Sequence, residues 1–123
     1  MRMTDKRREL FETAMAEARA ARRAGRLDEA FAHLERAHVM GQFWIGPHLA
    51  SHWGMLHVGL LRLDPREIVG QVVRLALTIP GTLAGRLPHG NTGGANVSAF
   101  RPMAISPELQ RVLAEADARA ELR

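Results

Sequence analysis

Helix start signals recur along this chain at helix-length intervals, and they constrain its fold more than any other feature. They are Thr4, Asp28, Pro47, the pair Asp64 and Pro65, and the pair Ser106 and Pro107. Ser, Thr and Asp accept hydrogen bonds from the free N–H groups of a first helical turn, and proline fits there because it has no N–H. We therefore expect five helices, at about residues 5–24, 29–41, 47–61, 65–77 and 107–121.

The apolar residues of these stretches recur at the three- and four-residue spacing of a helix face. The first stretch has Phe11, Ala14, Met15, Ala18 and Ala21, and the fourth has Ile68, Val69, Val72, Val73, Leu75 and Ala76. Short connections between consecutive helices favour antiparallel neighbours. The expected fold is therefore a single all-α domain over residues 1–123, a compact helical bundle of two helix hairpins plus a C-terminal helix.

The segment at 79–105 differs in composition from the helices around it. It contains IPGTLAGRLPHGNTGGANVSAFRPM, residues 79–103, in which Gly, Asn and Pro favour turns and left-handed backbone. We expect a long, ordered, Gly/Asn-rich irregular segment that packs across the bundle as a strap. The run GNTGGAN lacks the GK[ST] of a nucleotide-binding Walker loop. A lid over a site, and an anion site flanked by Arg86 and Arg101, are alternatives to a purely structural strap.

Composition narrows the range of partners. The chain has no Cys, which excludes disulfides and thiolate metal ligands. Its net charge of +4 comes from basic residues interleaved with acids, and it has no Tyr, which argues against nucleic-acid binding. No apolar run approaches the roughly 20 residues of a membrane span. The beginning MRMTDKRRELFE is charged where a signal peptide is apolar. We expect a cytoplasmic protein without a membrane partner.

The residues that point to chemistry lie in ERAHVMGQFWIGPHLASH, residues 35–52. Glu35 and His38 are three residues apart and His48 and His52 four, so each pair shares a helix face. Antiparallel packing of the two helices lets all four side chains converge near their short connection. Three imidazoles and a carboxylate suit zinc, or a partial iron or manganese site, and fit copper or nickel less well. We therefore predict that Glu35, His38, His48 and His52 bind a divalent transition metal.

Ordinary structural roles explain the same residues, and that interpretation stays open. Glu35 could pair with an arginine at the surface, His48 could be a polar residue of a first helical turn, and His52 could be a buried imidazole bonded to a carbonyl. Glu67 and Gln71 lie one turn apart on the fourth helix and could add an outer partner to the site. Capping and contact with solvent explain that last pair more simply. The pattern assigns no catalytic residue.

Two stretches resemble known families. The segment GRLPHGNTGGANVSAFRPM, together with LERAHVMGQ and PHLASH, resembles a family of small bacterial proteins classed as a domain of unknown function. The likeness covers most of the chain, and it implies that the segment and the histidines form one unit. The stretch AEARAARRAGRLDEAFAHLERA, residues 16–37, resembles one tetratricopeptide repeat through Gly25, the DEA at 28–30, Leu34 and Ala37. A stable solenoid needs at least three such repeats.

The function predicted from the sequence is a cytoplasmic metal-binding helical protein with a His/Glu site between its second and third helices. Such a protein could act as a small metalloenzyme. The alternative is a non-enzymatic module, in which the tetratricopeptide-like hairpin holds a protein partner or forms a homodimer. Elemental analysis separates the two hypotheses, because only the first requires bound metal.

Overall fold

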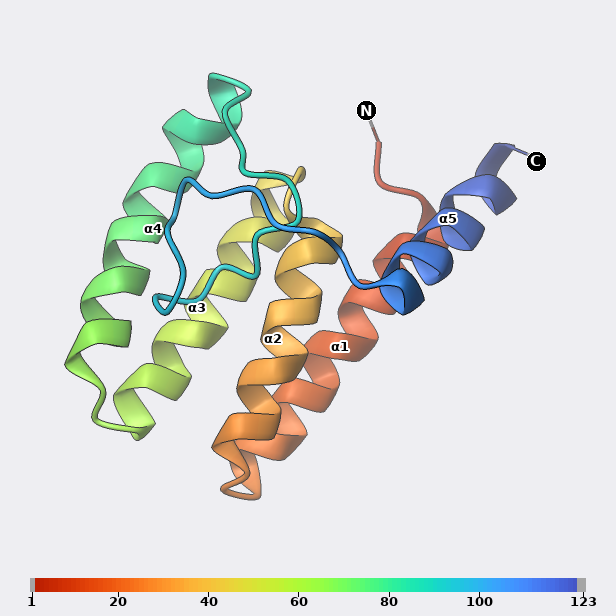
Figure 1. Ribbon diagram of the computed structural model, residues 1–123. Helices are drawn as coiled ribbons and strands as arrows, with labels where there is room; N and C mark the ends of the chain where they lie inside the picture. Colours follow the sequence, from red (N-terminus) through yellow and green to blue (C-terminus); the bar gives the residue numbers. More distant parts are fainter. Residues whose placement is uncertain (1, 122–123) are drawn as a thin grey trace.

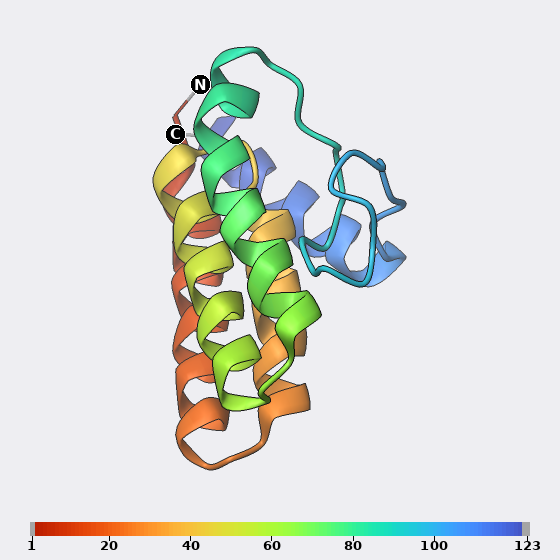
Figure 2. The ribbon, with the colours of Figure 1, turned by 90° about the vertical axis from the view of Figure 1, so that its left-hand side faces the viewer.

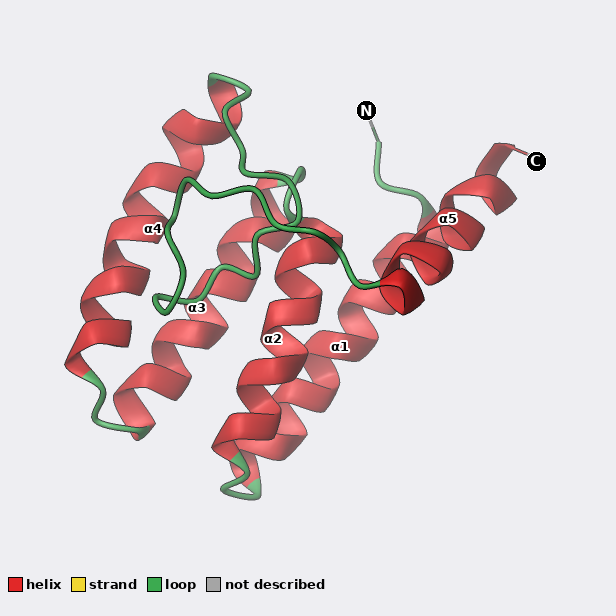
Figure 3. Ribbon diagram, in the orientation of Figure 1, coloured by secondary structure: helices red, strands yellow, loops and turns green. Residues whose placement is uncertain are grey.

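The computed structural model describes residues 2–121, and within this range the chain forms five α-helices and no β-strand (Figures 1 and 3). The all-α class predicted from the sequence is therefore confirmed. The helices are α1 Asp5–Arg23, α2 Leu27–Gly41, α3 Ile45–Leu61, α4 Pro65–Leu83 and α5 Pro107–Glu121.

Two helices begin earlier than the sequence predicts. The N-cap of α2 is Arg26, so Asp28 lies inside the first turn instead of capping it. The N-cap of α3 is Trp44, so Pro47 also lies inside the first turn and not at its first position. An acid stabilises any position of the first turn through the helix dipole, and proline is tolerated there. These signals therefore locate a helix start to within a turn.

Three helices end with the same backbone motif. The residue after the C-cap of α1, α3 and α4 has a left-handed φ: +78° at Gly25, +54° at Leu63 and +68° at Gly85. Its N–H and that of the following residue donate to carbonyls of the last turn. Glycine adopts this φ without strain, whereas leucine does not.

α4 is longer than predicted, because it ends at Leu83 and not near Leu77. Pro80 lies inside the helix and removes one backbone hydrogen bond there. Two hydroxyls bond to carbonyls one turn back on either side of it: Thr78 donates to Arg74 and Thr82 to Thr78, both at 2.7 Å. The proline therefore does not terminate the helix, and the glycine motif after Leu83 does.

The apolar core lies around α1 and α2. α1 packs along α2, α2 along α3, and α3 along α4, while α5 packs on α1. One buried cluster joins α1, α2 and α5: Phe11, Ala14, Ala37, Val39, Met40, Leu109 and Leu113. A second joins α1, α2 and α3: Ala18, Ala21, Ala30, Phe31, Leu34, Met55 and Val58. Neither cluster includes a buried residue of α4.

α4 buries its polar face and exposes its apolar one. Its buried residues are Glu67, Gln71 and Thr78. Its exposed side chains, with 47–81% of their surface accessible, include Val69, Val72, Val73, Ile79 and Leu83. The apolar side chains of Ile68 and Leu75 are only half-buried, so we expect polar contacts to contribute more than hydrophobic burial to the position of α4.

Residues 84–106 contain turns and irregular backbone, and they lie on one side of the α2–α3–α4 group (Figures 1 and 2). Side chains of the helices bond this segment at both ends of its path. The fully buried amide of Gln42 donates to the Pro88 carbonyl at 2.6 Å and accepts from the Gly90 N–H at 3.1 Å. The guanidinium of Arg74 donates to the Val97 carbonyl at 2.6 Å. The segment is thereby attached both to the residue that follows α2 and to α4.

Candidate metal centre

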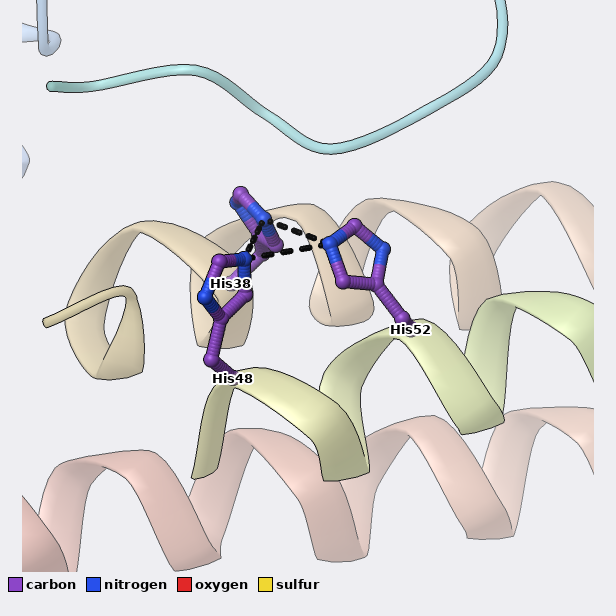
Figure 4. A group of neighbouring side chains, drawn as sticks. All are labelled: His38, His48 and His52. Atoms are coloured by element: carbon purple, nitrogen blue, oxygen red, sulfur yellow. Dashed lines mark hydrogen bonds between the residues drawn. The ribbon is translucent and has the colours of Figure 1, made fainter. Parts of the chain in front are cut away.

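Three of the predicted ligands meet at one point. His38 lies in the last turn of α2, and His48 and His52 lie one turn apart near the start of α3, so the short connection between these helices brings them together. Their Nε2 atoms form a triangle with sides of 3.0, 3.1 and 3.2 Å (Figure 4). The three residues are only 2–4% exposed. Each ring therefore directs the same nitrogen into a buried cluster.

The outer nitrogens of two of these rings face hydrogen-bond acceptors. Nδ1 of His38 lies 2.7 Å from the carbonyl oxygen of Asn91, which can only accept, so Nδ1 carries the proton. Nδ1 of His52 lies 2.7 Å from Oε1 of Gln71. A neutral imidazole that donates through Nδ1 keeps a bare lone pair on Nε2. Both rings therefore turn lone pairs, and not protons, into the cluster.

The orientation of the Gln71 amide is fixed by its other contacts. Its Nε2 donates to a carboxylate oxygen of Glu67 at 2.8 Å and to the Gly93 carbonyl at 2.9 Å, which leaves Oε1 to accept from His52. Nδ1 of His48 is buried and has no hydrogen-bond partner among the described residues. At most one of the three rings can therefore place a proton on Nε2, and repulsion between lone pairs remains without a cation.

Burial keeps the three imidazoles neutral. It lowers the pKa of His48 to about 4 and that of His52 to about 3, and it lowers the pKa of His38 well below its ordinary value. For His38 and His52, neighbouring cluster histidines and the Arg74 guanidinium lower the pKa further. Metal ions bind the neutral imidazole, so at neutral pH protons do not compete for this cluster.

The size of the triangle suits a transition-metal ion. Zn–N bonds of about 2.0–2.1 Å in a tetrahedron separate the nitrogens by about 3.3–3.4 Å. The observed sides of 3.0–3.2 Å fall just below that separation, so small rotations of the rings are sufficient. Three histidines leave a fourth position open, which is the arrangement of catalytic and not of structural zinc.

A cavity of about 360 Å³ adjoins the cluster. The three histidines line one part of it, and the second half of α4 and the segment 84–106 supply the rest of the wall. Most of that wall is apolar, with Arg74 and Thr78 among its polar residues. An ion at the cluster would therefore have an open coordination position next to a space large enough for a small molecule.

The Gly/Asn-rich segment supports the cluster through one buried residue. Asn91 is 2% exposed, and its side-chain amide donates to the carbonyls of Ser98 and Arg101 at 2.8 and 2.7 Å. Its side-chain oxygen accepts from the Gly93 N–H at 2.8 Å. The backbone of Gly93 then lies so close to His38 that an added Cβ would be 2.6 Å from the ring. The segment therefore orients His38 directly and Gln71 through a carbonyl.

Three backbone N–H groups that an anion site in this segment could use are already hydrogen-bonded within the protein. The N–H groups of Gly90, Gly93 and Ala95 already donate to side-chain oxygens of the protein, so these three are not free for an anion. Left-handed φ values occur at Gly90 and Gly93, as the glycine-rich composition indicates. At Gly93 the missing Cβ lets the backbone pass close to His38, and at Gly90 it lets the backbone pass close to Met103.

Glu35 is not part of the cluster, so the His/Glu site predicted from the sequence is a three-histidine site. Glu35 lies one turn further from the α2–α3 connection than His38, and its carboxylate is not among the groups that meet there. Glu35 is half-buried instead, where burial raises the pKa of its carboxyl, the Thr92 side chain lowers that pKa, and the charge of Glu67 raises it.

Sequence reasoning undervalued the residues that orient the rings. Gln71 and Glu67 are buried and hydrogen-bonded to each other, whereas the simpler expectation for them was capping and contact with solvent. For Asn91 and Gly93 the composition predicts turns or an anion site, and the family resemblance implies one unit with the histidines without assigning either residue a contact to a ring. The spacing of Glu67 and Gln71 on one helix face was the available signal, and it gave no information on which way that face turns.

These observations define an all-helical protein with a buried three-histidine cluster that could hold a metal ion. Residues 5–113 match the family described as "Protein of unknown function (DUF3703)", and the chain belongs to this family. The resemblance to a domain of unknown function is thereby confirmed. Neither the curated proteins nor the solved structures give a match. None of the described helices is long and apolar enough to cross a membrane.

Proposed function

We propose that this protein binds one divalent transition-metal ion through Nε2 of His38, His48 and His52. The observation that carries the proposal is the convergence of three buried Nε2 atoms, two of which have bare lone pairs. In a metal-free core this arrangement is repulsive, because the cluster has more acceptors than donors. A metal ion at the centre would remove this repulsion, because it would accept a lone pair from each of the three Nε2 atoms.

Zinc and iron(II) suit the site best. Imidazole is a good ligand for zinc, copper, iron and nickel, whereas manganese prefers oxygen ligands. Because Glu35 does not reach the cluster, manganese loses the carboxylate that favoured it. With three protein ligands, the ion would keep a position for water, and zinc in such a site lowers the pKa of bound water to about 7. A small metalloenzyme that activates water is the catalytic form of this proposal.

Metal binding is tested on protein purified without a histidine tag. We expect one equivalent of zinc per chain after dialysis of chelator-treated protein against zinc, and a tetrahedral cobalt(II) absorption spectrum after loading with cobalt. His48→Ala and His52→Ala should each weaken binding by more than about 100-fold, because each removes a ligand. The control is His57→Ala, which changes an exposed histidine outside the cluster. Full metal content in a His48→Ala/His52→Ala variant would contradict the proposal.

A second candidate function, dimerisation, is favoured by the outer face of α4. Val69, Val73, Ala76, Pro80 and Leu83 recur at spacings of 4, 3, 4 and 3 residues, as in the seam of a helix pair. All five are exposed, and α3 is the helix against which α4 packs. No charged residue falls within this stripe, so a second copy of the chain, placed by a two-fold axis, would cover apolar surface with apolar surface. We assign this face, and not the tetratricopeptide-like α1–α2 pair, to a homodimer contact.

Light scattering coupled to size-exclusion chromatography tests the dimer. We expect a dimer at micromolar concentration and a monomer for Val69→Glu, whose side chain is 62% exposed on α4. The matched control is Trp53→Glu, because Trp53 is 57% exposed but lines a hollow with α1 residues on another side of α3. A monomeric wild-type protein at 100 µM would exclude this second function and leave the metal centre unaffected.

A further inference from the structure

We propose that the cavity beside the histidine cluster binds a small organic carboxylate, with its carboxylate between the metal ion and the guanidinium of Arg74 and its apolar part along α4 and the segment 84–106. This inference rests on the proposed metal centre and names the ligand class of the same site. The volume of about 360 Å³ lies within the range of small-molecule sites.

Arg74 lines this cavity, and the protein holds its guanidinium in place. Its two terminal nitrogens donate to protein carbonyls, those of Gly70 at 3.1 Å and Val97 at 2.6 Å. Its Nε is buried without a partner among the described residues and does not face the open space of the cavity. Because the two carbonyls fix the guanidinium, its positive charge is preorganised beside the cavity for an anion that comes from outside the protein.

The charge balance of the site calls for an anion. The three histidines are neutral ligands, so a bound divalent ion keeps its full charge. The guanidinium of Arg74 adds a positive charge close enough to disfavour protonation of His38 and His52. Among the described residues no carboxylate forms a salt bridge with Arg74, and the charge of Glu67 compensates only part of the combined charge of the ion and the guanidinium. The remaining positive charge is unfavourable in an apolar environment, and an anionic ligand removes that penalty.

The rest of the wall selects an organic anion over phosphate or sulfate. Leu77, Pro80, Leu87, Ala99 and Phe100 line the cavity away from the histidines. An inorganic oxyanion would leave this apolar wall in contact with water. A carboxylate with a short hydrocarbon chain satisfies the ion and Arg74 at one end and buries CH₂ groups at the other, each contributing about 0.8 kcal/mol.

The inference is tested on cobalt(II)-loaded protein, by titration with acetate, butyrate, hexanoate and hexanol while the cobalt absorption is recorded. We expect each carboxylate to shift the spectrum. Hexanoate should bind roughly tenfold more tightly than butyrate, because it buries two more CH₂ groups. Hexanol, the neutral analogue, should bind at least tenfold more weakly than hexanoate. Equal affinities for acetate and hexanoate would overturn the assignment of the apolar wall.

Two variants separate the parts of the proposal. Arg74→Gln removes the positive charge beside the cavity, so we expect hexanoate affinity to fall about tenfold with an unchanged cobalt spectrum. Leu77→Trp fills the cavity and should abolish the dependence on chain length. The control is Ile79→Trp, because Ile79 is 47% exposed on the same helix and does not line the cavity. Wild-type hexanoate affinity in both test variants would overturn the inference.

The test also distinguishes failure of the ligand site from failure of the metal centre. Protein that gives no tetrahedral cobalt spectrum overturns the metal centre, and the carboxylate site with it. A normal cobalt spectrum that hexanoate leaves unchanged overturns the carboxylate site alone.

Discussion

α2 and α4 both pack against α3, yet they bury opposite kinds of side chain. The buried residues of α2 are mainly apolar and include Ala30, Phe31, Leu34 and Ala37. Those of α4 are Glu67, Gln71 and Thr78. Burial of apolar surface stabilises a helix in proportion to its area, whereas a polar network does so only when its hydrogen bonds are complete. The two sides of α3 therefore depend on different physical forces.

This difference divides the molecule into two regions. The core region comprises α1, α2 and α5, which share the buried apolar clusters. The network region comprises α4 and the segment 84–106, which are joined through Glu67, Gln71 and Arg74. The hydrogen bonds of the network region lead to the outer nitrogens of His38 and His52. We therefore expect any change at the cluster to affect the network region first.

Lowering the pH should have the largest effect on the difference in stability between the core region and the network region. In the unfolded chain the histidine pKa is about 6.5, whereas burial holds those of His48 and His52 at about 4 and about 3 in the folded, metal-free chain. Between these values the unfolded chain binds protons that the folded chain excludes, so the free energy of unfolding falls as the pH falls. For His48 alone the loss is about 3 kcal/mol between pH 6.5 and pH 4.

Urea unfolding of metal-stripped protein between pH 7.5 and pH 4.5 measures this loss, and amide exchange locates it. We expect α4 and the segment 84–106 to lose protection before α1 and α2. A His48→Gln/His52→Gln variant should show a shallower pH dependence, because glutamine does not titrate. Equal stability of the wild-type protein at pH 7 and pH 5 would contradict the burial of neutral histidines.

Zinc should have the opposite effect to acid, and should stabilise the network region more than the core region. A ligand that binds the folded chain alone stabilises it by about 2.7 kcal/mol at 100 times its dissociation constant. Because the ion would hold rings that the network region orients, we expect zinc to slow amide exchange in α4 and the segment 84–106 more than in α1. Uniform slowing throughout the chain would show that the two regions unfold as one unit.

Gly93→Ala should disturb the cluster from the side of the segment. An added Cβ would lie 2.6 Å from the His38 ring, and the φ of +88° is unfavourable for alanine. We expect metal affinity to fall by about 10- to 100-fold, which is typical when the support of a ligand is changed. Gly46→Ala is the matched control, because its Cβ would meet nothing within 4 Å. Calorimetric zinc titration of both variants measures the difference, and equal affinities would contradict the close approach.

The predictability of the fold from the sequence also differs between the regions. The apolar spacing of Phe11, Ala14 and Ala18 indicates a buried helix face, and these residues are buried. The same reasoning applied to Val69, Val72 and Val73 identifies an apolar face correctly but not its direction, because that face is exposed. A hydrophobic pattern shows that a helix has two faces, and it shows which one is buried only where apolar burial dominates.

The histidines of the candidate site could be predicted from the sequence, because they depend on local spacing. His48 and His52 share a helix face, and the short connection places His38 beside them. Glu35 lies one turn further from that connection, and spacing along one helix does not show whether its carboxylate reaches the other helix. The sequence offered Gln71 only as one possible outer partner and gave no role to Asn91 at the cluster, since the contacts of both residues join segments that are distant in the sequence.

The smallest expected effect concerns the turns that follow α1 and α3. The connections after α1 and α3 share one backbone motif, but Gly25 occupies the left-handed position in the first and Leu63 in the second. A left-handed φ is unfavourable for a residue with a Cβ by about 1–2 kcal/mol, and glycine offsets part of this gain through its larger unfolded-state entropy. Leu63→Gly should therefore stabilise the protein by about 0.5–1 kcal/mol, since the leucine side chain is 84% exposed and contributes little packing. The reciprocal change, Gly25→Ala, should destabilise it by about 1 kcal/mol. Urea unfolding at pH 7 measures both, and a loss of stability in Leu63→Gly would mean that the exposed leucine has a packing role that outweighs its strained backbone.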